Sequence, residues 1–415
     1  MENVKTFTYL GVDLQANGRM KTAVSSRIAK TNRALFLIRQ ALKTTGNVNT
    51  SLALSIFDKQ IMPILTYGCP LWGLPNTTNY ILMTGTDQPN MGRDIINTVT
   101  SKIVKTTWIR NTSSINNPKR LLLNLDNIDD KDLIFRNRHI LPPGVDIHDV
   151  DIDHDKQDYE KIHTKFCKYV LNIPKQAGND ASRGELGRFP LSTKIWKHAI
   201  KYWLRLEKES ENIFVNNAYR CAKMENHPWI QKVRNLLSRF GLGHIWANPN
   251  QYSSSHIGNL FERRLKDIYI QTWNAKQSNS SRFKLQHSLT NEYGLSIYLK
   301  NITCLENRNT ITRLRLDMNM LNECMGRQQR SPTRLCPHCP TKTESVEHFL
   351  LNCSKYDLER TYFVRELAKV HRYFSSWSPS RQLHLLLNCG DINSLQVVSS
   401  FILKIYKLRR AYVPI

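Results

Sequence analysis

Four residues in the segment CPHCPTKTESVEHFLLNC have the types and the spacing of metal ligands. Cys336, Cys339, His348 and Cys353 follow the pattern C-x2-C-x8-H-x4-C. Three thiolates and one imidazole complete a tetrahedral shell around zinc and leave no position open for water. The spacing therefore predicts a structural zinc ion (Zn2+) within residues 336–353, which stabilises a fold and takes no part in a reaction.

The separation of His348 and Cys353 places a condition on the local backbone. Five residues of α-helix rotate by about 140° beyond a full turn, so the two side chains converge only if the helix ends before Cys353. Asn352 is a suitable terminator. The alternative is that Cys336 and Cys339 are ordinary buried thiols and His348 is a surface histidine, but four ligand types rarely coincide at such intervals.

Length and composition set the class of protein. A chain of 415 residues and 48.3 kDa has the material for two or three domains. No run of eighteen uncharged apolar residues occurs, which predicts no membrane partner. The start, MENVKTFTYL, lacks the layout of a signal peptide, and nine cysteines, an odd number, indicate reduced thiols. We expect an intracellular protein, cytoplasmic or nuclear; the oligomeric state is left open.

The chain is strongly basic, and its acidic residues are unevenly distributed. The formal net charge is +25. Residues 126–160 contain eleven Asp and Glu against four Lys and Arg, so the rest of the chain carries 55 basic and 23 acidic side chains, a net charge of +32. Such a surface attracts polyanions and favours RNA or DNA as the partner. The alternative is that much of the excess lies on solvated helix faces.

The hydrophobic pattern predicts a mainly α fold. Residues 7–14 have the pattern of a short strand, followed by a turn at Asn17-Gly18, and residues 76–158 are irregular and rich in Asn, Thr and Asp. Apolar residues recur at helical spacing in the other segments, and Pro63 is expected to bend the second of them. The predicted helices are 21–43, 49–67, 159–171, 192–209, 213–224, 229–240 and 261–277.

Several short motifs, taken in order, resemble the C-terminal part of reverse transcriptases from non-LTR (LINE-type) retrotransposons. The helix predicted over 21–43, which is basic, follows the first of these motifs, and the predicted zinc-binding segment with EHFLL (347–351) is the last. The resemblance spans nearly the whole chain. The motifs are FTYLGV (7–12), PILTYGCPLWG (63–73), FCK (166–168), GELGRFPL (184–191), IKYW (200–203), and LRL (314–316) with Glu323 and Gly326-Arg327.

The resemblance implies the organisation of the chain. Residues 1–75 would form a helical thumb-like bundle, 76–158 an irregular acidic linker or insertion, 159–276 a helical connector domain, and 283–415 a C-terminal region with the zinc module. In this family the catalytic aspartates lie in a palm upstream of the strand that FTYLGV resembles. Only six residues precede that strand here, and Asp129-Asp130 follow it. We therefore expect no polymerase activity and no catalytic residues.

The resemblance also implies which residues touch nucleic acid. Arg27, Lys30 and Arg33 on the thumb-like helix would face backbone phosphates. A second basic set, formed by Arg327, Arg330 and Arg334, would approach the zinc module. The expected function is therefore that of a nucleic-acid-binding remnant of a reverse transcriptase. The alternative is a zinc-containing protein-interaction module with no nucleic-acid role, in which the charge serves only solubility.

Overall fold

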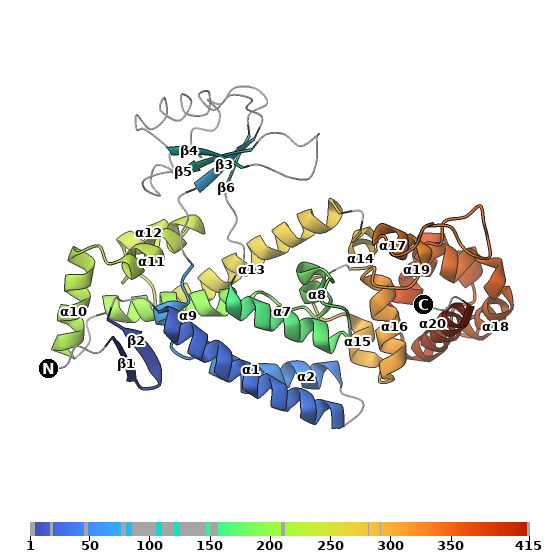
Figure 1. The fold of residues 1–415 in the computed structure, drawn as a ribbon, viewed down its shortest axis with the longest axis horizontal. Helices are drawn as coiled ribbons and strands as arrows, with labels where there is room; N and C mark the ends of the chain where they lie inside the picture. The colour runs from blue at the N-terminus through green and yellow to red at the C-terminus, as the bar shows by residue number, and fades with distance from the viewer. Residues whose placement is uncertain are drawn as a thin grey trace. The chain divides into compact units, whose positions relative to one another are not determined.

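The protein is mainly helical, as predicted (Figure 1). The computed structural model describes residues 5–16, 20–44, 49–75, 80–84, 105–109, 120–124, 146–149, 157–208, 212–280, 282–290 and 292–412. Within these ranges no helix is both long enough and apolar enough to cross a membrane.

The chain divides into two compact units that are not consecutive in sequence. The first unit comprises Met1–Trp72, Asp155–Ile195 and Glu262–Ile415, and the second comprises Gly73–His154 and Trp196–Phe261. This division differs from the expected succession of regions, because the segment 336–353 belongs to the same unit as the N-terminal helices. Two long helices, α9 (Leu191–Glu207) and α13 (Ser254–Ser278), contribute residues to both units.

The N-terminal segment is a β-hairpin. Strands β1 (Thr6–Tyr9) and β2 (Val12–Gln15) pair antiparallel. The two residues between them, Leu10 and Gly11, have φ angles of 45° and 75°. Two successive positive φ values define a tight type I′ turn, which Gly11 favours because it has no side chain. The expected single strand over 7–14 is thus corrected to two strands, and the turn expected at Asn17-Gly18 lies outside the described residues.

The expected helix over 21–43 is confirmed as α1 (Lys21–Thr44). The expected helix over 49–67 consists of three consecutive segments, namely α2 (Thr50–Ile56), a π-helical turn η1 (Phe57–Ile61) and α3 (Met62–Thr66). In the turn the Met62 N–H bonds to the Phe57 carbonyl. Because Pro63 has no N–H to continue the ladder, the helix passes it through a widened turn. A short helix, α4 (Cys69–Trp72), follows.

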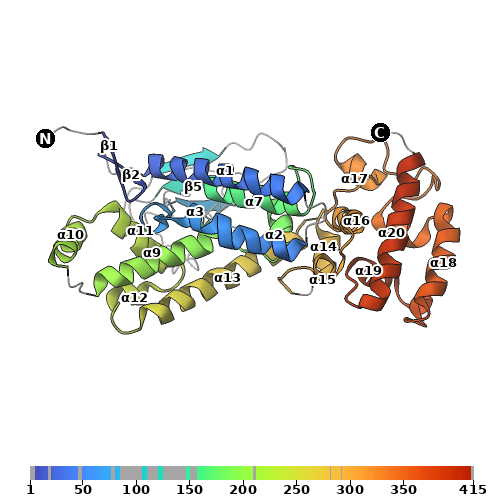
Figure 2. The same ribbon diagram turned by 90° about the horizontal axis from the view of Figure 1, so that it is seen from below.

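The remaining elements of the first unit are helices and short helical turns. Helix α1 contacts α7, and α20 contacts both α16 and α18, between which it lies in Figure 2. The elements are α7 (Asp158–Val170), α8 (Asn179–Glu185), α14 (Lys284–Leu289), α15 (Ile297–Asn301), α16 (Leu305–Arg315), α17 (Asn322–Arg327), η4 (His348–Asn352), η5 (Ser354–Tyr356), α18 (Asp357–Leu367), η6 (Phe374–Ser376), α19 (Pro379–Leu387) and α20 (Ile392–Tyr412).

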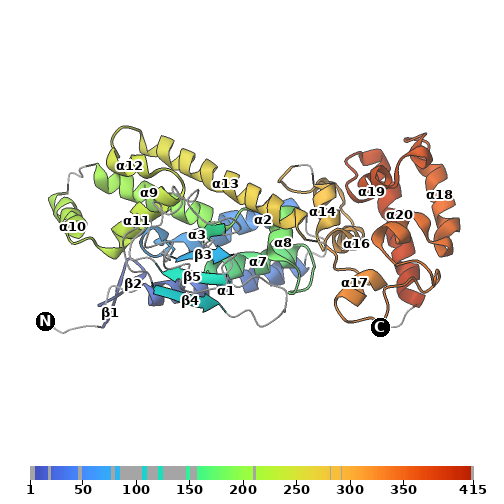
Figure 3. The ribbon, with the colours of Figure 1, turned by 90° about the horizontal axis from the view of Figure 1, so that it is seen from above.

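The second unit contains a helical cluster and a sheet. Helices α10 (Ile213–Met224), α11 (Pro228–Arg239) and α12 (Gly243–Ala247) follow α9, whose Trp203 ring stacks on Trp246 at 5.1 Å between centroids. The antiparallel sheet, labelled in part in Figure 3, has the order β4-β5-β3-β6. Its strands are β3 (Tyr80–Thr84), β4 (Lys105–Ile109), β5 (Arg120–Asn124) and β6 (Asp146–Asp149).

These strands fall in the stretch that was expected to be irregular. The runs YILMT and RLLLN are apolar enough for strands, and they pair residue by residue from Tyr80↔Asn124 to Thr84↔Arg120. The expectation of an irregular 76–158 is corrected accordingly for these four segments. Short strands between long polar stretches give too few residues for a periodic pattern, which is why they were missed. Asp129 and Asp130 lie outside the described residues.

A buried ion pair connects α8 with α16 in the first unit. The Nε of Arg315 donates to Oε1 of Glu185 at 2.6 Å, and both side chains are at most 1% exposed. The second oxygen of Glu185 accepts from Gln286 Nε2 at 3.0 Å. Arg315 Nη1 also donates to the carbonyl of Leu387 at 2.9 Å. Each charge is therefore compensated by several partners, as a buried charge requires.

We expect Glu185→Ala to destabilise the first unit by about 3–5 kcal/mol, because it leaves the Arg315 guanidinium buried without its counter-charge. Thermal or urea unfolding followed by circular dichroism measures the change. The matched control is Glu366→Ala, which removes a partly exposed pair with Lys369. Equal stability of the Glu185 variant and this control would show that the buried pair does not hold α8 against α16.

Candidate metal centre

The first two cysteines lie in a short knuckle of backbone. Leu335 and Thr343 form an antiparallel bridge at its base, and the Cys336 N–H donates to the Lys342 carbonyl at 2.8 Å. At the tip, the N–H of Cys339 donates to the carbonyl of Cys336 at 3.3 Å, and the N–H of Lys342 donates to that of Cys339 at 2.9 Å. These successive turns direct both sulfurs to the same side, as the C-x2-C spacing predicted.

The other two ligands lie at the ends of a π-helical turn, η4 (His348–Asn352). The N–H of Cys353 donates to the carbonyl of His348 at 2.7 Å, a bond that spans five residues. The helix ends at Asn352, and Cys353 is extended, with φ −71° and ψ 119°. The prediction that the helix ends before Cys353 is confirmed. The widened turn brings residues five apart onto one side, which a regular α-helix does not do.

The four predicted ligands form one cluster. Their donor atoms all lie within 4.8 Å of one another, with Cys353 Sγ 3.8 Å from Cys336 Sγ and 4.0 Å from Cys339 Sγ. The Nε2 of His348 is buried and has no hydrogen-bond partner in the described part of the chain. A buried ring nitrogen without a partner is costly unless a ligand takes that position. The cluster can therefore hold a metal ion.

The imidazole of the cluster is held in the form that binds a cation, whereas the Cys336 and Cys353 thiols need a cation to ionise. Burial lowers the pKa of the His348 imidazole, which favours the neutral form that ligates metals. Burial raises the pKa of the Cys353 thiol to about 12, and it raises that of Cys336 despite hydrogen bonds from the backbone N–H groups of His338 and Cys339. Three adjacent thiolates repel one another, so a bound cation is what stabilises their ionised form.

Two arginines hold the backbone around this cluster. Arg360 of α18 donates from Nη2 to the Cys353 carbonyl at 2.9 Å and from Nε to the Leu350 carbonyl at 3.2 Å. Arg409 of α20 forms a buried pair with Glu344, at 2.5 Å from Nε to Oε1. The sequence did not single out these residues, because no local pattern distinguishes them from other arginines. They anchor the metal-binding segment to two helices.

His338 lies outside the cluster, although it is adjacent to Cys339. Its ring contacts Tyr356 edge-on, with the centroids 6.4 Å apart. The remaining cysteines are dispersed and make no disulfide. The predicted ligand set is thus the one that the fold brings together within the described residues.

The basic residues predicted on α1 do not share one exposed face. Arg27 is buried, donates through Nη2 to the Gly11 carbonyl, and stacks over the Tyr67 ring at 4.4 Å from its centroid. Lys30 and Arg33 are exposed. Positions three apart on a helix differ by about 60° in direction, so Arg27 points toward the core, whereas Lys30 and Arg33 lie progressively closer to solvent. The expectation that Arg27 faces phosphates is corrected: it supports the N-terminal hairpin.

The residues of the second basic set, Arg327, Arg330 and Arg334, also differ in their environments. Arg327 pairs with Asp317 and lies 3.7 Å from Glu323, so its charge is largely compensated. Arg330 and Arg334 are exposed and make no ion pair among the described residues. Of this set, Arg330 and Arg334 remain as candidates for an external anion near the metal cluster.

Comparisons with models of known families, with curated proteins and with solved structures found no match for this chain. The metal-binding cluster and the distribution of charge are therefore the grounds for a functional assignment.

We expect the purified protein to carry one equivalent of metal that depends on the four-residue cluster. Cys339→Ser and His348→Ala should lose it and expose the segment around residues 335–356 to protease, because metal binding supplies folding free energy there. Metal content by mass spectrometry and limited proteolysis measure both effects. Cys221→Ser and His338→Ala are the controls and should retain the metal. A stoichiometric ion that survives in His348→Ala but is lost in His338→Ala would mean that the other histidine is the ligand.

Proposed function

We propose that Cys336, Cys339, His348 and Cys353 bind a structural Zn2+ ion. With metal–sulfur bonds of about 2.3 Å, a regular tetrahedron has sulfur–sulfur edges of about 3.8 Å. The separations of 3.8 and 4.0 Å from Cys353 fit that geometry without rearrangement. Four protein ligands leave no place for a reacting water. The ion would therefore stabilise the knuckle, η4 and their contacts with α18 and α20.

We propose further that the chain acts as a nucleic-acid-binding remnant of a non-LTR retrotransposon reverse transcriptase, without a polymerase site of its own. The observation that carries this proposal is a closed four-ligand cluster within a helical chain of net charge +25. Exposed cations lie on α1 and near the metal cluster, where Lys30, Arg33, Arg330 and Arg334 are available for phosphates. RNA or DNA is the polyanion that this charge fits.

We expect the protein to bind single-stranded RNA and DNA with affinity that falls steeply as salt rises. Lys30→Ala/Arg33→Ala should weaken binding to different sequences alike and reduce the log–log salt slope by about two units, one for each lost phosphate contact. Fluorescence anisotropy with labelled oligonucleotides measures this. An unchanged slope would remove α1 from the interface, and a wild-type protein that binds no polyanion would favour the protein-interaction alternative.

Arg27→Ala serves as the contrasting variant. We expect it to lower thermal stability by about 1–3 kcal/mol, because it removes a buried hydrogen bond to the hairpin turn, and to leave the salt slope unchanged. Differential scanning calorimetry and the same anisotropy titration separate the two effects. A reduced slope with unaltered stability would instead place Arg27 at the phosphate backbone.

We also expect no primer extension on an RNA template with Mg2+ or Mn2+, because the motifs of this chain resemble the thumb and the C-terminal region of the family, whereas the aspartates that hold two catalytic metal ions lie in its palm. Incorporation of labelled nucleotides is the measurement, with a no-protein reaction as the baseline. Incorporation above that baseline that Asp129→Ala abolishes would contradict the proposal.

A further inference from the structure

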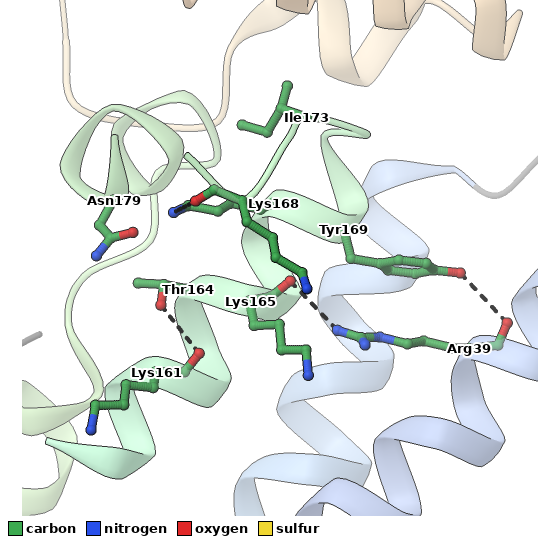
Figure 4. A pocket seen from close by; sticks show the side chains of 9 residues that line it. Arg39, Lys161, Thr164, Lys165, Lys168, Tyr169, Ile173 and Asn179 are labelled. Atoms are coloured by element: carbon green, nitrogen blue, oxygen red, sulfur yellow. Dashed lines mark hydrogen bonds between the residues drawn. The ribbon is translucent and has the colours of Figure 1, made fainter. Parts of the chain in front are cut away.

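A cavity of about 490 Å3 lies in the first unit, between α1 and α7 and beside the loop that follows α7 (Figure 4). Its lining contains five cations and no carboxylate. The nine lining residues are Arg39, Lys161, Thr164, Lys165, Lys168, Tyr169, Ile173, Lys175 and Asn179. We infer that this cationic pocket binds phosphate groups, and that its ligand is the phosphodiester backbone of a nucleic-acid strand. The choice of ligand rests on the proposed function, whereas the phosphate site rests on the pocket alone.

The lysines of α7 form a stripe along one side of the helix. Lys161, Lys165 and Lys168 stand four and three residues apart, and such positions are neighbours on a helix surface. Like charges at this spacing repel one another and lower the stability of the helix. The opposite face of α7 is buried against the core. The stripe is therefore not needed for packing, and an external anion would relieve the repulsion.

Acidic side chains do little to neutralise the pocket. Asp158 pairs with Lys161 at 2.7 Å, but both side chains are about three-fifths exposed, and exposed pairs contribute little. Lys165 and Lys175 make no ion pair within the described residues. Lys168 donates from Nζ to the Lys175 carbonyl at 2.7 Å, which fixes its position.

Arg39 lies at the α1 side of the pocket and is held without a counter-ion. Its guanidinium stacks over the Tyr169 ring at 4.8 Å from the centroid, and the Tyr169 hydroxyl donates to the Arg39 carbonyl at 3.5 Å. Nη2 makes one long bond of 3.5 Å to the Lys165 carbonyl, and Nε has no partner among the described residues. Figure 4 shows this stacked arrangement, which leaves donor capacity for an anion.

The composition of the pocket fits phosphate better than a carboxylate metabolite. One ordered arginine with four lysines presents many donors around a volume that holds more than one phosphate group. Ile173 and Tyr169 are the apolar residues of the lining, and its other apolar surface belongs to side chains that end in charged or polar groups. A strand that carries one charge per nucleotide matches both the number of cations and their spread over the loop and two helices.

The test uses the full-length protein with Lys165→Gln/Lys175→Gln. Both lysines contribute only backbone carbonyls to the local hydrogen bonds from Arg39 and Lys168, so the substitutions remove charge and leave the scaffold intact. The control, Lys5→Gln/Lys300→Gln, removes the same charge from two exposed positions outside the pocket. The probes are a fluorescein-labelled oligothymidylate, its RNA counterpart and inorganic tripolyphosphate.

We expect the pocket variant to bind the oligonucleotides severalfold more weakly and with a salt slope lower by about two units, while the control shows a smaller and uniform loss. Protection of lysines from acetylation gives a second measurement on the unmutated protein. Lys165 and Lys175 should be protected by the oligonucleotide, and Lys5 and Lys300 should not.

The outcomes distinguish this inference from the proposed function. If the wild type binds oligonucleotides and the pocket variant binds them equally well, with Lys165 and Lys175 unprotected, the pocket inference is overturned and the proposed function stands. If only tripolyphosphate binds and the pocket variant loses it, the phosphate site stands, its ligand is a free phosphate compound, and the nucleic-acid function fails. Binding of neither probe overturns both.

Discussion

The carboxylate of Glu185 joins segments of the first unit that are far apart in sequence. It accepts from Arg315 of α16 and from Gln286 of α14, while the backbone carbonyl of the same residue accepts from the N–H of Ser296 at 3.1 Å. Arg315 continues the connection to the end of α19 through the Leu387 carbonyl. A buried charge tolerates no loss of partners, so this junction fixes the mutual positions of these helices. The junction lies within the unit that includes both the N-terminal helices and the segment 336–353.

The metal cluster depends on a second junction of the same kind. Glu344, in the knuckle segment, pairs with Arg409 near the end of the chain and accepts from the Asn322 N–H at 2.6 Å. Arg360 holds two carbonyls of the segment that carries His348 and Cys353. These anchors, one ion pair and two hydrogen bonds to carbonyls, hold a segment with little apolar area of its own, and an ion bound by the four side chains would add to them.

The sequence predicted those features whose signal is local. The ligand spacing identified the cluster, and helical periodicity identified α1, α7 and α11 to within about two residues. It missed features that depend on partners distant in the chain. Arg27 has the spacing of a surface cation, and its burial follows from the Gly11 carbonyl, sixteen residues away. The strand pairing between Tyr80–Thr84 and Arg120–Asn124 likewise joins segments separated by a long polar stretch.

The cationic side chains of this chain lie in two different environments, the interior and the surface, and this difference bears on function. Several interior arginines have carboxylate partners, as Arg183 has in Asp180, Arg188 in Asp58 and Arg409 in Glu344. Removing Arg409 leaves the buried Glu344 carboxylate unpaired, whereas removing Lys165 leaves no unpaired group inside the fold. The interior cations are therefore explained by stability. A run of lysines around a cavity is not, because their mutual repulsion opposes folding, and an anionic ligand is the physical reason that would retain them.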